Sequence, residues 1–176
     1  MKNLIKILSI TFFVFLIIFI FRFYFFNKTV KYKIISEKDS FSNVSRNLTD
    51  NILIWDMIDE SQNETTRMLT FTFNKCDVDV EKLKVSHKTN CIGYANVFSN
   101  LLKAKFIDKN VDKNWKIKHS VAEIYFLGIN VNKLTSNPFF KDHDIVVIEN
   151  KLSGENIAVD PTLFDYFGID RISLKK

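Results

Sequence analysis

Three residues whose types could carry out covalent acyl chemistry occur in the order cysteine, histidine and aspartate. The first, Cys91, stands where an amphipathic helix is predicted to begin, with Thr89 or Asn90 as its N-cap. The free N–H groups and the dipole at a helix N-terminus favour an anion, and therefore the nucleophilic thiolate form of cysteine. The same N–H groups could stabilise the oxyanion that forms when a thiolate attacks a carbonyl carbon. The other interpretation of Cys91 is a small, buried apolar residue.

A histidine and an aspartate stand at the two ends of a predicted β-hairpin. His143 opens one predicted strand and Asp160 closes the next, so the turn between them brings the two residues near each other. A general base needs an orienting group within hydrogen-bond reach, and this pair would supply both. A tight turn centred on Ser153-Gly154 would place Val147 opposite Asp160, so the predicted pairing requires an uneven loop or a β-bulge.

The elements that must position these residues are predicted from the spacing of apolar side chains. In the helix that begins at Cys91, apolar residues recur three and four positions apart, at Tyr94, Val97, Phe98, Leu101 and Leu102. An earlier segment has the same spacing, at Val44, Leu48, Ile52, Trp55 and Ile58. Strands are predicted farther along, at residues 121–127, 145–149 and 157–160. Helices that precede strands are typical of the α+β class, so we expect the cysteine helix to pack on an antiparallel sheet.

Two of these segments resemble motifs of the transglutaminase-like proteins, a superfamily with a papain-like fold. Residues 90–102 resemble the Cys-x-Gly-Tyr-Ala-x-x-Phe-x-x-Leu-Leu helix of that family. Residues 159–162, Val-Asp-Pro-Thr, resemble its terminal motif, whose aspartate orients the catalytic histidine. The resemblance covers roughly residues 85–165 and keeps the family's order of Cys, His and Asp. It implies a transglutaminase-like core whose catalytic triad consists of Cys91, His143 and Asp160.

The histidine motif departs from the family's pattern. The family usually has His-Ala-Trp before an alternating strand, whereas this chain has His143-Asp144-Ile145. A second histidine, His119, begins a similar stretch. His143 precedes Asp160 by 17 residues and His119 precedes it by 41, and the shorter separation fits a single hairpin. We therefore assign the catalytic role to His143 and keep His119 as the alternative.

The N-terminal run from Leu4 to Phe26 is almost wholly apolar. About 20 apolar residues suffice to span the hydrocarbon of a bilayer. The run ends in bulky aromatic residues, unlike the small residues of a signal-peptide cleavage site. The sequence therefore predicts a transmembrane anchor at residues 1–27, a juxtamembrane connector at 28–40 and a transglutaminase-like domain at 41–176. The predicted localisation is a single-pass membrane protein. Positive residues flank the run on both sides, so the sequence leaves both sides of the membrane open for the domain, with the extracytoplasmic side as one alternative.

The formal net charge of +5 comes from the N-terminal region. Residues after Lys33 carry 19 basic and 20 acidic side chains, so the predicted domain is close to neutral. A nucleic-acid-binding domain needs its excess positive charge in the folded part. The charge distribution therefore excludes nucleic acid as a partner and is typical of residues that flank a membrane.

Taken together, the sequence predicts a membrane-anchored thiol enzyme that hydrolyses or transfers the acyl group of a peptide or amide bond. Its expected partner is a peptide or protein substrate. We expect no cofactor and no metal, because the second cysteine, Cys76, lacks the paired Cys or His spacing of a zinc site. The alternative is a catalytically inactive transglutaminase-like module that binds peptides or acts as a scaffold at the membrane.

Overall fold

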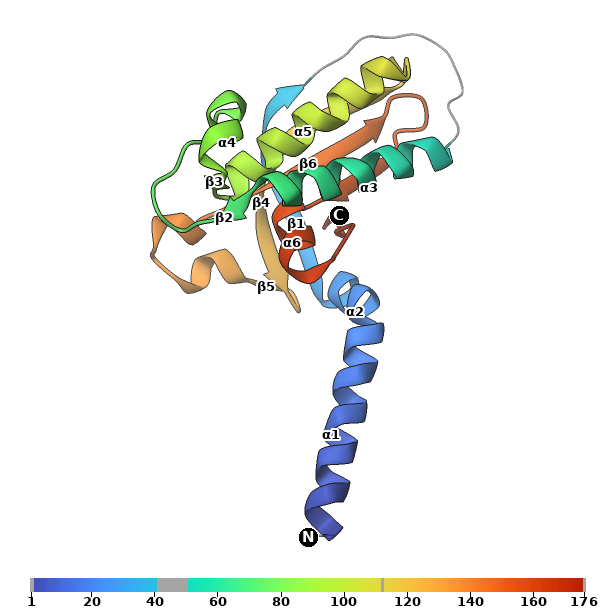
Figure 1. The fold of residues 1–176 in the computed structure, drawn as a ribbon, viewed down its shortest axis with the longest axis vertical. Coiled ribbons are helices and arrows are strands. Elements are labelled where there is room, and N and C mark those ends of the chain that lie inside the picture. The colour runs from blue at the N-terminus through green and yellow to red at the C-terminus, as the bar shows by residue number, and fades with distance from the viewer. Residues whose placement is uncertain (1, 41–50, 112, 176) are drawn as a thin grey trace.

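The computed structural model describes residues 2–40, 51–111 and 113–175, which form an α+β fold with a largely antiparallel main sheet (Figure 1). The α-helices are α1 (Lys2–Ile20), α2 (Arg22–Thr29), α3 (Asn51–Met68), α4 (Val80–Ser86), α5 (Cys91–Asp108) and α6 (Pro161–Phe167). The strands are β1 (Val30–Ser40), β2 (Thr70–Phe71), β3 (Lys88–Thr89), β4 (Trp115–Phe126), β5 (Ile129–Asn130), β6 (His143–Asn150) and β7 (Asn156–Val159). Two short 3-10 helices, η1 (Val131–Leu134) and η2 (Pro138–Phe140), lie between β5 and β6. The predicted helix positions Val44 and Leu48 fall outside the described residues.

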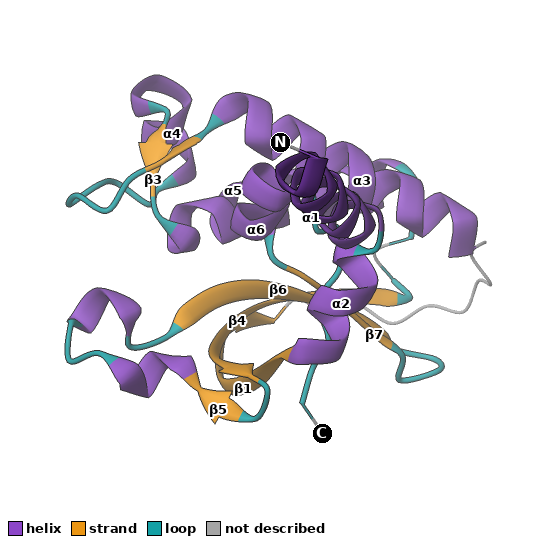
Figure 2. Ribbon diagram, turned by 90° about the horizontal axis from the view of Figure 1, so that it is seen from below, coloured by secondary structure: helices purple, strands orange, loops and turns teal. Residues whose placement is uncertain are grey.

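The main sheet is built around β4, which pairs antiparallel with β1 on one side and with β6 on the other, while β7 pairs with β6. C-terminal residues join the two outer strands: Tyr32 of β1 forms a bridge with Leu174, and Ala158 of β7 forms one with Ile172. Backbone hydrogen bonds of 2.9 Å, from Tyr32 to Ser173 and from Ile172 to Ala158, hold these bridges. Because the C-terminal segment links both outer strands, the sheet curls around its inner face, as Figure 2 shows.

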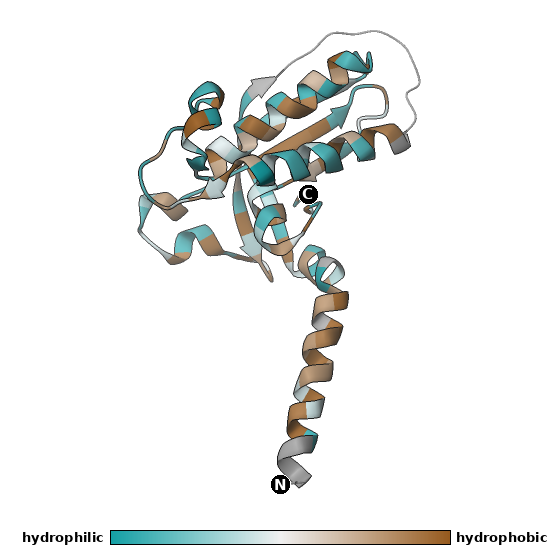
Figure 3. Ribbon diagram, viewed as in Figure 1, coloured by the Kyte–Doolittle hydropathy of each residue, from teal (hydrophilic) through white to brown (hydrophobic). Residues whose placement is uncertain are grey.

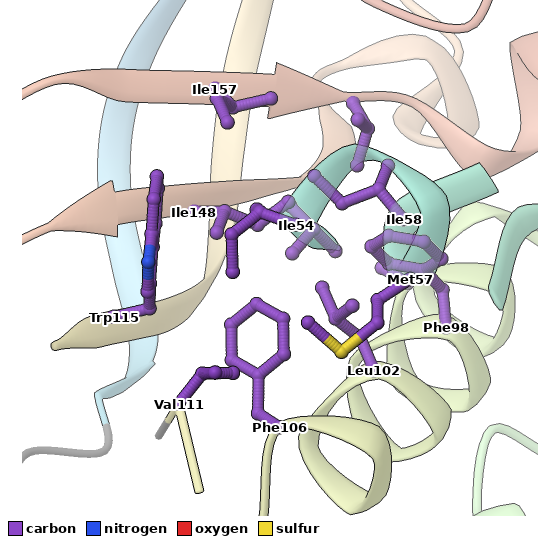
Figure 4. Close-up of a cluster of buried hydrophobic side chains, with 13 residues drawn as sticks. Ile54, Met57, Ile58, Phe98, Leu102, Phe106, Val111, Trp115, Ile148 and Ile157 are labelled. Atoms are coloured by element: carbon purple, nitrogen blue, oxygen red, sulfur yellow. The ribbon is translucent and has the colours of Figure 1, made fainter. Parts of the chain in front are cut away.

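Alternate residues of β6 pack in two different cores, as the two-residue period of a strand requires. Val146 and Ile148 face α3 and α5 in the main core (Figure 4). Ile145 and Val147 face the inside of the curled sheet, in a second core that includes Tyr32. The buried members of the main core are Ile54, Met57, Ile58, Ala95, Phe98, Leu102, Phe106, Val111, Trp115, Val146, Ile148, Ile157 and Val159.

Helix α5 lies along β6 and runs in the same direction, so the first residues of both elements lie at one end of the sheet (Figure 1). Phe98 and Leu102 pack on the sheet, which confirms this part of the predicted helix packing. Tyr94 and Val97 are also buried, but in a third cluster beside α4. Leu101 is only half-buried and packs against that third cluster, so its predicted contact with the sheet is wrong.

The predicted transmembrane helix is wrong for the part of the chain that the structure describes. In residues 2–40, 51–111 and 113–175, no helix is both long and apolar enough to cross a membrane. The apolar run is divided, because α1 ends at Ile20 and α2 begins at Arg22. α1 is hydrophobic along much of its length, as Figure 3 shows.

The residues predicted as a connector, 28–40, belong to the folded domain. Strand β1 pairs with β4 along most of its length, from Val30 opposite Phe126 to Ser40 opposite Lys118, with two register shifts. The predicted boundary at residue 41 therefore lies too late. The strand signal was present in the sequence, since charged lysines alternate there with apolar residues.

Replacing Leu102 with Ala should lower the free energy of unfolding by about 2–5 kcal/mol, because it removes a fully buried side chain and leaves a cavity in the main core. Urea unfolding followed by circular dichroism measures this loss. The matched control is Leu152→Ala in the turn between β6 and β7, where the leucine is 56% exposed; it should cost less than about 0.5 kcal/mol. Equal losses for the two variants would contradict the proposed core.

Candidate active site

Cys91 is the first residue of α5, as predicted. The side-chain oxygen of Asn90 accepts a 3.1 Å hydrogen bond from the backbone N–H of Ile92 and caps the helix. The close approach of Thr89 to the first turn explains the glycine at position 93: a Cβ atom there would lie 1.9 Å from Thr89 Oγ1. Thr89 is itself fixed, because its hydroxyl donates to the carbonyl oxygen of Asp77 at 2.8 Å. Strand β3 and helix α5 are thus held tightly together on both sides of Cys91.

His143 and Asp160 are in direct contact, at a distance of 2.7 Å between Nε2 and Oδ2. Their hairpin pairs Val146 with Val159, and a loop closed by the backbone bond from Asn150 N–H to the Glu155 oxygen joins the strands. If this register continues, Asp160 comes opposite Ile145, two residues after His143 and on the same face. The two side chains therefore meet diagonally. No bulge between β6 and β7 is needed, because the loop is longer than the tight turn considered from the sequence.

Asp160 accepts four hydrogen bonds. Oδ2 accepts from His143 Nε2 and, at 3.0 Å, from the hydroxyl of Tyr32. Oδ1 accepts from the backbone N–H groups of Thr162 and Leu163, at 3.1 and 3.0 Å, and so caps α6. Pro161 occupies the first helical position, where its missing N–H is not needed. The Val-Asp-Pro-Thr segment therefore has a local role as a helix start in addition to holding His143.

The electrostatics of this pair favour its charged form. Burial alone would lower the pKa of His143, but the Asp160 carboxylate and the Cys91 sulfur together raise it well above 6.5. Burial would raise the pKa of Asp160, yet His143, a backbone N–H and Tyr32 lower it below 3.8. Burial, followed by the charge of Asp160, raises the pKa of the Tyr32 hydroxyl well above 10.0 and keeps it protonated as a donor. His143 is therefore held as an imidazolium between Asp160 and Cys91.

Because Nε2 of His143 faces Asp160, Nδ1 is the ring nitrogen available to the Cys91 sulfur. Cys91 is among the groups that raise the pKa of His143, and both residues line one cavity of about 510 Å³. The structure thus brings together all three residues predicted for the site, at the open end of the β6–β7 hairpin.

A second histidine–aspartate pair lies on the other side of Cys91. His119 is buried, and its Nε2 lies 2.6 Å from Asp144 Oδ1, while Nδ1 contacts Asn96 at 2.9 Å. The Cys91 thiol donates to Asp144 Oδ2 at 3.9 Å, and Lys38 forms an ion pair with the same carboxylate. Burial opposes ionisation of Asp144, but His119 and Lys38 lower its pKa below 3.8. His119, the alternative base, therefore contacts the sulfur only through Asp144.

Sequence reasoning missed Asp144, Lys38 and Tyr32. Asp144 had a detectable signal: it directly precedes the predicted strand 145–149 and is in phase with Val146 and Ile148, at a position where a charged residue is uncommon. Lys38 and Tyr32 lie on β1, whose residues were assigned to a connector.

Within residues 2–40, 51–111 and 113–175, no group of three or more His, Cys, Asp or Glu side chains could hold a metal ion. Cys76 is half-buried near the Thr89 hydroxyl, at 4.0 Å, and both cysteines are free thiols.

Comparison with protein-family models, with curated proteins and with solved structures found no significant match. The resemblance to transglutaminase-like proteins therefore stays a prediction.

The charged His143–Asp160 pair should stabilise the fold most between pH 3.8 and pH 6.5, the ordinary pKa values of the two side chains. Below this window the contribution of Asp160 is lost as the pH falls through its lowered pKa. Above it the contribution of His143 is lost as the pH rises through its raised pKa. The Asp160→Asn penalty, about 3–5 kcal/mol for one partner of a buried pair, should therefore be largest near pH 5 and smaller near pH 9.

Urea unfolding at the two pH values measures this difference, and asparagine keeps the cap of α6. The control is Asp77→Asn, which breaks an exposed ion pair with Lys82 and should cost at most about 1 kcal/mol at either pH. An Asp160→Asn penalty that does not change with pH would contradict a charged pair.

Proposed function

We propose that this protein is a transglutaminase-like thiol enzyme that hydrolyses or transfers the acyl group of a peptide or amide bond. One observation carries the proposal: Cys91 and His143 line the same cavity, while the far nitrogen of His143 is held by Asp160 at 2.7 Å. A cysteine nucleophile, a base beside it and a group that orients the base are the parts that nucleophilic catalysis requires. The start of α5 adds backbone N–H groups near the sulfur.

In the first half of the proposed reaction, Cys91 reacts as the thiolate of an ion pair with the His143 imidazolium, whose Nδ1 carries the proton, and the sulfur forms a bond to the amide carbonyl carbon. Asp160 holds the imidazolium in place and stabilises its charge. First-turn N–H groups of α5 stabilise the oxyanion; the N–H of Ile92 is excluded, because it donates to Asn90. The C–N bond then breaks, His143 gives its proton to the departing amine, and a thioester on Cys91 remains.

In the second half, His143 takes a proton from water, and the hydroxide attacks the thioester carbon. The C–S bond breaks, the carboxylic acid leaves, and His143 keeps the proton, so that the pair of thiolate and imidazolium is restored. If an amine replaces water, the product is a new amide. We favour hydrolysis, because the cavity is open to solvent and the His143 side chain is 20% exposed.

One contact favours a second candidate, a module that binds peptides without catalysis. The Cys91 sulfur donates to the Asp144 carboxylate, and a neighbouring negative charge disfavours a thiolate. This effect is reduced because His119 and Lys38 both pair with Asp144. The charge balance around Asp144 therefore decides between the enzyme and the binding module.

The enzyme proposal predicts that Cys91 reacts with iodoacetamide much faster than Cys76 at pH 6. An ordinary thiol, with a pKa of about 8.5, is under about 1% thiolate at that pH. Both cysteines are half-buried and are followed in one sample by peptide mass spectrometry, so Cys76 is an internal reference. We expect at least about a tenfold difference, and a large part of it should be lost in His143→Ala because the imidazolium stabilises the thiolate.

The matched control is His87→Ala, which changes an exposed histidine outside the site and should leave the Cys91 rate unchanged. Activity is measured as hydrolysis of fluorescein-labelled casein, and incorporation of dansylcadaverine into casein reports amine transfer. Cys91→Ser should abolish both signals, whereas Cys76→Ser should preserve them. If Cys91 and Cys76 react alike and casein is unchanged, the inactive binding module is the correct function.

A further inference from the structure

Four phenylalanine rings form a continuous aromatic cluster next to the candidate nucleophile. Phe71 and Phe73 come from β2 and the residues after it, and Phe139 and Phe140 come from η2. The ring centroids of Phe71 and Phe73 are 5.0 Å apart, those of Phe73 and Phe139 are 5.1 Å apart, and those of Phe139 and Phe140 are 5.2 Å apart. Two segments far apart in the sequence thus meet through their rings.

The η2 side of this cluster is fixed by two asparagines. The buried side chain of Asn132 uses both ends of its amide: Oδ1 accepts from the Ile124 N–H at 2.6 Å, and Nδ2 donates to the Phe140 carbonyl at 3.0 Å. Asn137 Oδ1 accepts from the Phe139 N–H at 3.0 Å. These bonds attach η2 to the central strand β4, so the rings project from a rigid support and lose little freedom when a ligand binds.

The β2 side is attached to the helix that carries the thiol. Phe71 pairs with Thr89 in the β2–β3 ladder, two residues before Cys91. Its N–H also donates to the Tyr166 hydroxyl at 3.3 Å, and its ring lies 6.3 Å from that of Tyr94 in α5. The position of Phe71 is therefore coupled to the position of Cys91.

The cluster and the catalytic pair line one cavity. The four phenylalanines, Cys91 and His143 all border the space of about 510 Å³, a volume in the range of small-molecule sites. Phe73 is 67% exposed and Phe140 is 45% exposed, so their faces are accessible to a ligand. A molecule that binds in this cavity lies next to Cys91 and His143, so it is the substrate on which these two residues act. Asp142 is the carboxylate of the lining, and the positive charge of His143 is paired with Asp160, so an anionic occupant is disfavoured.

We infer that the Phe71, Phe73, Phe139 and Phe140 cluster binds an aromatic or bulky aliphatic side chain of the substrate. The preferred substrates are then peptides or amides that carry such a group next to the bond that reacts, and acidic groups at that position are disfavoured. An aromatic group of the ligand can pack edge-to-face or offset against these phenylalanine rings, so an aromatic side chain fits the cluster best. This inference rests on the proposed function, because it identifies the substrate class of the same site.

The test compares two alkylating reagents, iodoacetamide and N-phenethyl iodoacetamide, which differ only in the phenethyl group on the amide nitrogen. We expect the phenethyl reagent to modify Cys91 at least about tenfold faster than iodoacetamide, because burial of the phenyl group adds binding energy near the sulfur. Cys76 does not border the cavity and should show a ratio near one in the same sample.

The variants Phe73→Ala and Phe140→Ala, alone and together, should lower the Cys91 ratio toward one. Both rings are exposed, so their loss should leave the fold intact. Phe126→Ala is the matched control, because Phe126 is 48% exposed and lies outside the cavity lining. It should leave the ratio unchanged. A ratio that survives in the double variant would overturn the inference, and so would equal ratios for Cys91 and Cys76.

Peptide hydrolysis separates this inference from the proposed function. Among fluorogenic peptide amides with Phe, Ala or Asp next to the scissile bond, the Phe substrate should have the highest kcat/KM and the Asp substrate the lowest. A high alkylation ratio without hydrolysis would retain the aromatic site and overturn the enzyme. Hydrolysis without preference for Phe would retain the enzyme and overturn the aromatic site. A ratio that falls as the protein concentration rises would assign the cavity to a second copy of the chain and overturn the inference.

Discussion

Asp160 is a buried carboxylate, 1% exposed, and its removal from water costs several kcal/mol unless a cation and hydrogen-bond donors compensate it. Its donors come from three separate elements: Tyr32 of β1, His143 of β6, and the first turn of α6. These elements must therefore meet at the end of the curled sheet where β6 begins and β7 ends. Since α5 runs along β6 in the same direction, this requirement also places Cys91 at that end.

The sulfur of Cys91 consequently lies between two carboxylates with different partners. Asp160 acts on it through His143, which it keeps protonated, and this arrangement favours a thiolate. Asp144 contacts it directly and opposes a thiolate, but His119 and Lys38 compensate much of its charge. The two carboxylates act from different sides of the sheet because His143 and Asp144 are neighbours in β6. The side chains of adjacent residues in a strand point to opposite faces. Whether Cys91 reacts as a thiolate thus depends on how far His119 and Lys38 compensate the negative charge of Asp144.

Much of the site could be predicted because its elements are local. The cap at Asn90, the apolar spacing of α5, and the hairpin that joins His143 to Asp160 all follow from residues close together in the sequence. The contacts of Tyr32 and Lys38 could not be predicted, because they depend on how β1 pairs with β4, a long-range register that no local pattern specifies. The predicted span failed for another reason. The average hydrophobicity of a segment does not show where a helix ends, and α1 ends at Ile20, within the apolar run.

The central claim is that Cys91, His143 and Asp160 form one coupled unit, and an NMR titration of His143 tests it most directly. In protein labelled with ¹⁵N-histidine and assigned with His143→Gln, we predict a His143 pKa well above 6.5. The midpoint should fall in Cys91→Ser, because a source of negative charge is lost, and it should fall further in Asp160→Asn. A His143 that titrates near 6.5 and does not respond to Cys91→Ser would contradict the account.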